Sequence, residues 1–462
     1  MIRARGLHLT YPEMPHPALA GLDLDLDEGE VLGVVGAMGA GKTSLCLALA
    51  GLAARTSGGE SGGELEVAGV DPRVAPVRDL GRRVGLVFED YAAQLTQITV
   101  LSEVMAPMLN RGTPVEQSHD RALELLADLG LAHLDPAVKR TWELSGGQQQ
   151  RVAIAAALAG EPQVLMLDNV TGMLDPAGKE DVRRLTATLS TRMTLVIVEE
   201  DFDLLVGIAD RLLVLRAGAQ VAHGPATALL RDVDMLTGAM VEPPTVVQVA
   251  RAADLRTDPL TVEELARGSR VIGGTNPPTP EYVPAEPRDR GGPWAVEVRD
   301  VDYRYADGTA AVQGVSLRVA PGEVHAVVGG NGAGKSTLLH LLCGLRRPAS
   351  GTVVVGDHDT RDHTPAELAH VVGTALQNPD EQITERTVRG EIAYALRLRR
   401  FRRVGWLRRQ LVRTEEEIAD AVERARRVVG LPETLMDADP THLSRGHRKL
   451  VAIAGALALQ PA

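Results

Sequence analysis

Two short glycine-rich segments have the residue types and spacing of a loop that binds phosphate groups. Residues 36–44 read GAMGAGKTS and residues 329–337 read GGNGAGKST, so both fit the pattern G-x-x-x-x-G-K-[ST]. In such a loop, backbone N–H groups converge on phosphate oxygens, the lysine reaches the β and γ phosphates, and a hydroxyl binds Mg²⁺. The predicted nucleotide-binding residues are Gly36, Gly39, Gly41, Lys42, Thr43 and Ser44 in the first loop and Gly329, Asn331, Gly332, Gly334, Lys335, Ser336 and Thr337 in the second.

A carboxylate that could hold the same metal ion follows the first loop. Residues 164–168 read VLMLD, an apolar run that predicts a buried strand ending in Asp168. An aspartate in this position holds Mg²⁺ against the nucleotide phosphates. We therefore expect Thr43 and Asp168 to bind Mg²⁺ at one site and Ser336 to bind it at the other.

The elements that must position these residues also occur twice. Apolar runs at 31–36 and 324–329 predict buried strands that lead into the two loops, and apolar helical segments follow. The segment LSGGQQQR from Leu144 returns as LSRGHRKL from Leu443, so the chain contains one module twice. We place the modules at 1–240 and 293–462, with two tail helices and a proline-rich linker at 241–292.

The composition excludes several other classes of protein. Hydrophobic residues make up 44% of the 462 residues and charged residues 24%, which is typical of globular domains. A net charge of −12 argues against a protein that coats nucleic acid. Two cysteines cannot build a disulfide scaffold or a cysteine zinc module. We find no run of 18 uncharged apolar residues, so no transmembrane helix is expected.

The segment LSGGQ at residues 144–148 resembles the signature of the ATP-binding cassette (ABC) family. The resemblance implies an α/β fold with two P-loop NTPase domains in tandem, each with a RecA-like mixed sheet, an antiparallel β part and a helical subdomain. It also implies an intramolecular head-to-tail cassette dimer. Ser145, Gly147 and Gln148 would then close over ATP on the second loop, and Ser444 and Gly446 over ATP on the first.

Tyr11 and Tyr305 occupy the position at which this family places an aromatic ring on adenine. An ordinary strand tyrosine is the alternative at both positions. The family also has a lid glutamine, which senses the γ-phosphate, and Gln377 matches it.

The sequence NPDEQ that follows Gln377 is similar to the energy-coupling factor importers, which take up vitamins, cobalt or nickel. The first module retains Gln94 of this stretch, and residues 243–268 resemble the tail helices of those ATPases. The resemblance implies a transmembrane coupling subunit, a substrate-capturing membrane subunit and a place on the cytoplasmic face of the membrane. A sugar- or peptide-type tandem importer and a soluble tandem cassette protein on ribosomes remain alternatives, and no nucleic-acid partner is expected.

Departures from the family pattern collect at one of the two composite sites. In the first module, Glu89 replaces the family's lid glutamine, Asn169 replaces its catalytic glutamate and Glu200 replaces its switch histidine. The second signature, which would pair with the first loop, has Arg445 and His447 in place of Gly and Gln. We therefore expect site one, which joins the first loop to the second signature, to bind nucleotide only. Site two, which joins the second loop to the first signature, is expected to hydrolyse it. Slow hydrolysis at site one stays open.

Two further features stand in the second module. Its counterpart of Asp168 is due just beyond Ala462, so we expect a C-terminally truncated module that lacks the catalytic glutamate and the switch histidine and hydrolyses ATP poorly. The arginine-rich insert at 397–413 predicts a solvated helical face that pairs with the acidic helix after it. Contact with anionic headgroups or an acidic groove, and contact with nucleic acid, are the alternatives.

Overall fold

The computed structural model divides into two compact units, Met1–Thr279 and Pro280–Ala462. It describes every residue except 13, 15, 173, 201, 256–258, 270–292, 306–307, 331, 370, 399–400, 405–407, 412 and 462, and it describes only the backbone of 268–269, 401–404, 408–411 and 445. The predicted proline-rich linker, Thr275–Gly292, therefore lies outside the described residues.

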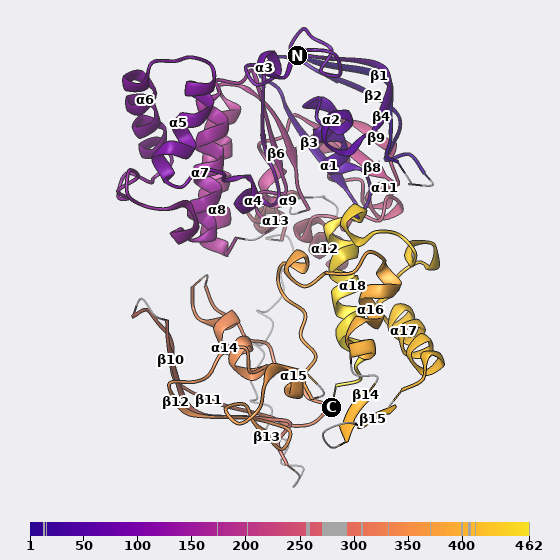
Figure 1. The fold of residues 1–462 in the computed structure, drawn as a ribbon. Coiled ribbons are helices and arrows are strands. Elements are labelled where there is room, and N and C mark those ends of the chain that lie inside the picture. Colours follow the sequence, from indigo (N-terminus) through magenta and orange to yellow (C-terminus); the bar gives the residue numbers. More distant parts are fainter. Residues whose placement is uncertain are drawn as a thin grey trace. The chain divides into compact units, whose positions relative to one another are not determined.

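The first unit is built on a six-stranded sheet in the order β5-β6-β7-β3-β8-β9, and all neighbouring strands run parallel except β8 and β9 (Figure 1). A second, antiparallel sheet has the order β2-β1-β4. The strands are β1 Ile2–Thr10, β2 Leu19–Leu26, β3 Val31–Gly36, β4 Glu60–Val67, β5 Val84–Val87, β6 Val164–Asp168, β7 Thr194–Val198, β8 Arg211–Arg216 and β9 Ala219–Pro225.

Strand β3 lies between β7 and β8 and has no exposed residue. Val31 and Val35 pack into one hydrophobic core, while Leu32 and Val34 pack into another. Because alternate side chains of a strand point to opposite faces, the sheet is covered on both sides. A continuous apolar run is what such a strand requires, and the predicted strand at 31–36 is confirmed.

Helices of the first unit cover the sheet and form a separate helical part from α5, α6 and α7 (Figure 1). The two predicted tail helices are present as α12 and α13. The helices are α1 Lys42–Leu49, α2 Ala53–Ser57, α3 Val77–Leu80, α4 Tyr91–Gln94, α5 Val100–Asn110, α6 Val115–Asp128, α7 Gly146–Ala159, α8 Pro176–Ser190, α9 Phe202–Leu205, α10 Ala226–Leu229, α11 Val233–Gly238, α12 Thr245–Ala252 and α13 Val262–Ser269.

The second unit has an antiparallel sheet in the order β11-β10-β12-β13, helix α14 against it, and a helical part with its own core. Both units are thus mixed α/β. The strands are β10 Val296–Arg304, β11 Ala310–Val319, β12 Ser350–Val355, β13 His358–Asp359, β14 Phe401–Val404 and β15 Arg408–Leu411, and the helices are α14 Lys335–Leu342, α15 Pro365–Leu368, α16 Val388–Leu398, α17 Glu415–Val429 and α18 Arg445–Ala458.

The predicted buried strand at 324–329 is wrong. The segment is assigned to no strand, and Val324 and Val328 are 99% and 87% exposed. The physical reason is pairing: β3 bonds to β7 and β8, which both come after α7 in the chain. No strand follows α18 among the described residues of the second unit, so the apolar run has no neighbour to bond to.

The predicted helical face at 397–413 is also wrong over most of its length. Helix α16 ends at Leu398, and β14 and β15 then form an antiparallel hairpin in which Phe401 pairs with Leu411. At the flank, Arg397 lies 3.8 Å from Glu415 of α17, so one of the expected pairings with the acidic helix is present.

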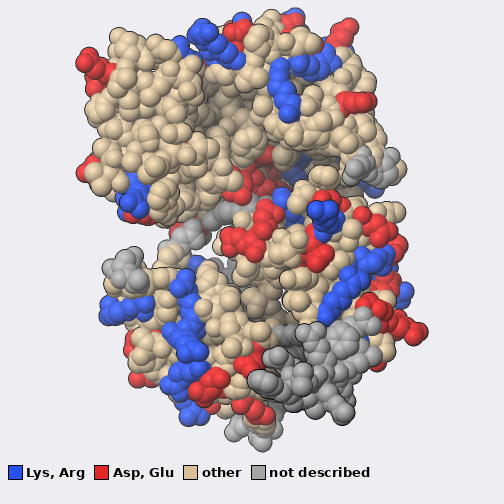
Figure 2. Space-filling model, viewed as in Figure 1, with Lys and Arg blue, Asp and Glu red and all other residues tan. Residues whose placement is uncertain are grey.

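Charge is mixed over the surface: on the face drawn in Figure 2, basic and acidic side chains stand near one another on both units. In the described part of the chain, no helix combines the length and the apolar character that a bilayer span requires.

Candidate nucleotide-binding sites

The first phosphate loop joins β3 to α1. Gly41 caps the helix with a φ of 99°, and a Cβ there would overlap the backbone carbonyl of Ala18, so only glycine fits. The Lys42 ammonium donates hydrogen bonds to the carbonyls of Gly36 at 2.6 Å and Ala37 at 3.2 Å. The ammonium is thereby folded over its own loop at a helix N-terminus, where anions bind.

The remaining predicted residues of this loop lie beside Lys42. Gly36 is the last residue of β3, Gly39 lies in the loop with a φ of 77°, and Thr43 and Ser44 lie in the first turn of α1.

The second phosphate loop has the same local geometry. Gly334 caps α14 with a φ of 89°, and Lys335 donates to the carbonyls of Gly329 and Gly330, both at 2.8 Å. Gly332 lies in the loop with a φ of 81°, Ser336 and Thr337 lie in the first turn of α14, and Asn331 is outside the described residues. The loop thus forms although 324–329 is not a strand.

Asp168 ends β6 and is 2% exposed beside the first loop. Burial raises its pKa to about 6, and the charge of Glu89 adds to the rise, while a hydrogen bond with Thr43 opposes it. A buried carboxylate in contact with a hydroxyl is the oxygen donor set that Mg²⁺ prefers, since this ion takes one or two carboxylates and completes its shell with phosphates and water. The two predicted ligands, Thr43 and Asp168, are therefore brought together.

Glu200 approaches the same loop from the end of β7. Its Oε1 lies 3.6 Å from the Lys42 Nζ, and the two side chains are 63% and 10% exposed. The charges of Lys42 and Glu200 both act on the pKa of Asp168, in opposite directions. The structure therefore places Glu200, which the sequence predicts at the switch position, against the side chain of Lys42.

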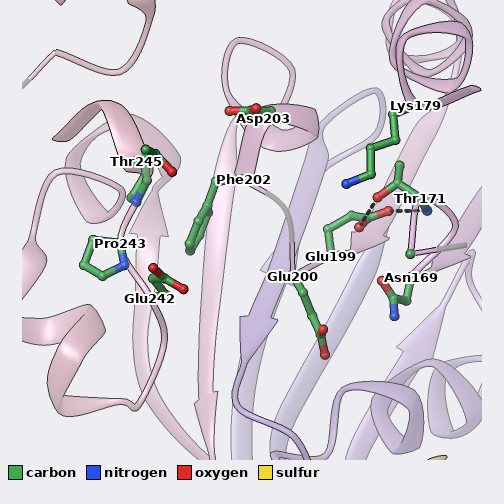
Figure 3. Close-up of a pocket in the computed structure, with 12 residues that line it drawn as sticks. Asn169, Thr171, Lys179, Glu199, Glu200, Phe202, Asp203, Glu242, Pro243 and Thr245 are labelled. Atoms are coloured by element: carbon green, nitrogen blue, oxygen red, sulfur yellow. Dashed lines mark hydrogen bonds between the residues drawn. The ribbon is translucent and has the colours of Figure 1, made fainter. Parts of the chain in front are cut away.

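Asn169 follows Asp168 with a φ of 49° and lines a cavity of about 410 Å³ (Figure 3). The cavity lies between the segment after β6, the segment after β7 and residues 242–245. Its lining residues are Asn169, Thr171, Gly172, Lys179, Glu199, Glu200, Phe202, Asp203, Glu242, Pro243, Pro244 and Thr245.

Glu199 is a residue that the sequence analysis missed. It is 1% exposed and accepts hydrogen bonds from the Thr171 N–H at 3.1 Å and the Thr171 hydroxyl at 2.7 Å, so it ties the segment after β7 to the segment after β6 (Figure 3). Its position directly after an apolar strand and beside Glu200 is the signal that could have identified it.

The first signature begins α7. Ser145 is the N-cap: its hydroxyl accepts from the Gln148 N–H, and the Gln148 side chain accepts from the Ser145 N–H at 3.0 Å. Gly147 lies in the first turn. Gln150, which the sequence analysis also missed, is fully buried and donates to the Val170 carbonyl, so α7 is tied to the segment that carries Asn169.

The second signature caps α18 in a related way. The Ser444 hydroxyl accepts from the His447 N–H at 3.3 Å and lies 2.9 Å from the His447 Nδ1, and burial lowers the pKa of that imidazole. Gly446 lies in the first turn of the helix. His447 therefore takes the capping place that Gln148 has in the first signature.

The two predicted adenine-stacking tyrosines are both half-buried beside their loops. The Tyr305 hydroxyl lies 2.8 Å from the Thr337 Oγ1, and the Arg346 guanidinium lies 4.8 Å from the centre of the Tyr305 ring. Tyr11 lies near Ser44, the counterpart of Thr337, and burial raises the pKa of Tyr11.

The two lid segments fold alike. The Gln94 side chain donates to the Leu86 carbonyl at 2.9 Å and accepts from the Phe88 N–H at 3.1 Å. Gln382 does the same with Thr374 and Leu376, both at 3.1 Å. The two lid positions differ in burial: Gln377 is exposed in the second lid, whereas Glu89 is half-buried in the first.

Comparison with known proteins gives matches over most of the chain. The family model described as ABC transporter matches residues 19–172 and 312–462. An ABC transporter ATP-binding protein from Caldanaerobacter subterraneus is 33% identical over all of this chain and 80% of its own length. One from Streptomyces coelicolor is 33% identical over all of this chain and 82% of its own length.

Solved structures of single cassettes match in part. A dimeric bacterial ABC transporter cassette is 28% identical and covers 49% of this chain and 98% of its own, with a TM-score of 0.44. The structure of cbiO1 from Clostridium perfringens, described as part of the ABC transporter complex cbiONQ, is 25% identical and covers 55% of this chain and 98% of its own, with a TM-score of 0.46.

Proposed function

Since the chain belongs to the ABC transporter family, we propose that this ABC ATPase is the motor subunit of a membrane importer of the energy-coupling factor type. It would act on the cytoplasmic face of the membrane together with a transmembrane coupling subunit and a substrate-capturing membrane subunit. The cargo class would be a vitamin or a cobalt or nickel ion.

The importer type is supported by the second lid. Residues 378–382 read NPDEQ, and Gln382 closes this segment by bonding back to Thr374 and Leu376. The exposed Gln377 stands next to it, where the family's lid glutamine senses the γ-phosphate. The tail helices α12 and α13 give further support, because their sequence resembles the tails of those ATPases.

Purification of the tagged full chain from its own membranes tests the importer assignment. We expect a multi-span coupling subunit and a second, substrate-capturing membrane protein in the purified complex. Ribosomal proteins in their place would overturn the assignment in favour of a soluble cassette protein. A coupling subunit without the capturing one would favour a sugar- or peptide-type importer.

We further propose that the two composite sites divide the work. In the head-to-tail arrangement of this family, site one combines the first loop with the second signature, and site two combines the second loop with the first signature. The observation that carries the division is the Lys42–Glu200 ion pair, which puts a carboxylate at the first loop's phosphate-binding lysine. Asn169 adds to it, since an amide cannot accept the proton of an attacking water as a carboxylate can.

The residues at each site have separate tasks in this scheme. At site one, Thr43 and Asp168 would hold Mg²⁺, which neutralises phosphate charge when bound, and Lys42 and the loop N–H groups would hold the nucleotide. At site two, Lys335 and Ser336 would hold the nucleotide, and Ser145 and Gly147 would offer the N-terminus of α7 to the γ-phosphate. Tyr305, fixed by Thr337 and Arg346, would support the adenine ring.

Turnover in the purified importer complex tests the division of work. We expect Lys335→Ala to lower steady-state ATP hydrolysis more than about a hundredfold and Lys42→Ala to lower it much less, because the substitutions at family positions (Glu89, Asn169 and Glu200) all lie at site one. Loss of turnover in Lys42→Ala with turnover retained in Lys335→Ala would reverse the assignment.

A further inference from the structure

The phosphate-binding lysine of the first loop already has an anionic partner inside the first unit. Lys42 donates to two loop carbonyls and also lies 3.6 Å from Glu200, with 10% of its side chain exposed. The ammonium therefore has two hydrogen-bond acceptors and one ion-pair partner within the first unit. A phosphate group that is to reach the tip of this lysine must share the lysine with the carboxylate or displace it.

The second loop provides an internal comparison. Lys335 makes the same two carbonyl hydrogen bonds, but among the ion pairs found in the described residues it has no carboxylate partner. The two loops therefore differ in one interaction at the tip of the lysine, while their glycines and their helix N-termini agree.

The position of Glu200 beside Lys42 is favoured electrostatically, because the cavity that Glu200 also lines is acidic. The cavity of about 410 Å³ that it lines also contains the carboxylates of Glu199, Asp203 and Glu242, and Lys179 is the single ammonium among the lining residues (Figure 3). In Figure 3 the Glu200 side chain points away from Asp203. Turning into the cavity would bring Glu200 towards like charges, whereas the loop offers it a cation.

The backbone of the loop and the tip of the lysine contact different parts of a nucleotide. The loop N–H groups cradle the α and β phosphates, while the lysine reaches from the β to the γ phosphate. Glu200 therefore opposes the γ-phosphate more than the β-phosphate. The charges of Glu89 and Glu200 both act on Asp168, so these three carboxylates lie near one another at the loop.

We propose that Glu200 makes the first site selective for nucleoside diphosphates over nucleoside triphosphates. The proposal rests on the proposed function in one respect, since it takes the first loop to be a nucleotide site. It adds the class of ligand: site one would retain ADP, and a triphosphate would bind there only by displacing Glu200 from Lys42.

Competition binding to the full chain tests this selectivity. The background is Lys335→Ala, which removes tight binding at site two, and a fluorescent ADP with Mg²⁺ is displaced by ADP or by the non-hydrolysable β,γ-imido analogue of ATP. We expect ADP to bind at least about tenfold more tightly than the analogue, since like charges a few ångströms apart interact this strongly near a surface. Glu200→Gln should reduce that ratio to about threefold or less, chiefly by tightening the analogue.

Glu242→Gln is the matched control. It removes the same charge from the same cavity, and the Glu242 side chain accepts from Gln248 without contact with Lys42. We expect it to leave the ADP-to-analogue ratio within about twofold. Glu200→Ala, measured alongside, separates loss of the carboxylate from any new hydrogen bond of the glutamine amide.

Three outcomes would overturn the proposal: an analogue that binds as tightly as ADP in the Lys335→Ala background, an unchanged ratio in Glu200→Gln, or an equal change in Glu242→Gln. These outcomes are independent of the turnover assay. If Lys335→Ala removes turnover but the analogue binds as well as ADP, the division of work stands and the selectivity fails. If Lys42→Ala removes turnover but Glu200→Gln shifts the ratio, the reverse holds.

Discussion

The two phosphate loops are alike, whereas the sheets that should carry them are not. In the first unit the loop continues from β3, which bonds to strands on both sides. In the second unit the same loop follows a segment that is assigned to no strand and carries strongly exposed valines. Both lysines nevertheless bond to two carbonyls of their own loops, and both helices begin at that lysine.

The difference separates local from non-local causes of structure. A loop closed by a left-handed glycine, a helix N-terminus and a lysine that bonds back over five or six residues needs only its own sequence. A parallel strand needs neighbours that come from distant parts of the chain. Val324 and Val31 have the same side chain and corresponding places in their modules, yet one is 99% exposed and the other 1%.

Amide hydrogen exchange tests this difference between the two segments most directly. The β3 amides are bonded within a sheet, and those of 324–329 have no strand partner, so we expect the β3 segment to exchange at least about a thousandfold more slowly. Mass spectrometry of peptides that cover 31–36 and 324–329 in the full chain measures it. Equal protection of the two peptides would mean that 324–329 is paired in solution.

The distinction between local and non-local causes also explains which features the sequence could predict. The loops, Asp168 at a strand end, the capping of α7 by Ser145 and the tail helices are each encoded within a few residues, and the sequence was sufficient for them. The unpaired segment at 324–329 and the hairpin at 401–411 were missed because pairing partners cannot be read from an apolar or basic run. The Lys42–Glu200 contact joins residues 158 positions apart, and only the fold brings them together.

Asp168 allows a test that applies to the first unit alone, since no counterpart of this carboxylate is present in the described part of the second unit. Asp168→Asn should weaken Mg²⁺-dependent nucleotide binding at the first loop by about a hundredfold, because it removes the charge of the proposed metal ligand. In the Lys335→Ala background the parent should lose Mg²⁺-dependent affinity as the pH falls through about 6, where the buried carboxylate takes up a proton. Nucleotide titrations at several pH values measure both effects, and a parent that is insensitive to pH between 7 and 5 would contradict the raised pKa.

Folding stability should change in the opposite sense. The folded pKa of Asp168 is raised above the ordinary value of a carboxyl group, so the unfolded state releases this proton more readily. Stability from this group is therefore fully present at low pH and is lost as the pH rises through about 6. Denaturation of the first unit, measured with and without Asp168→Asn, should show that contribution disappear in the variant.

The signature helices offer a smaller, matched test. Gln150 is fully buried and donates to the Val170 carbonyl, whereas its counterpart Lys449 is exposed on α18. Gln150→Leu should destabilise α7 by about 1–3 kcal/mol, because it leaves a buried carbonyl without its donor. Lys449→Leu should cost less than about 0.5 kcal/mol. Hydrogen exchange of the two helices measures both, and equal costs would show that α18 is packed as α7 is.

The helix caps should show the smallest effect and no difference between the units. Ser145 and Ser444 each accept a hydrogen bond from the N–H three residues along, and these contacts stay within one turn of their own helices. Replacing either with alanine should cost about 1 kcal/mol, the usual contribution of an N-cap side chain. The measurement is the exchange rate of the first-turn amides of α7 and α18 in Ser145→Ala and Ser444→Ala. If the cost were much smaller in α18, the capping contact itself would depend on the sheet behind the helix, and the division between local and non-local structure drawn from the two loops would not extend to the signatures.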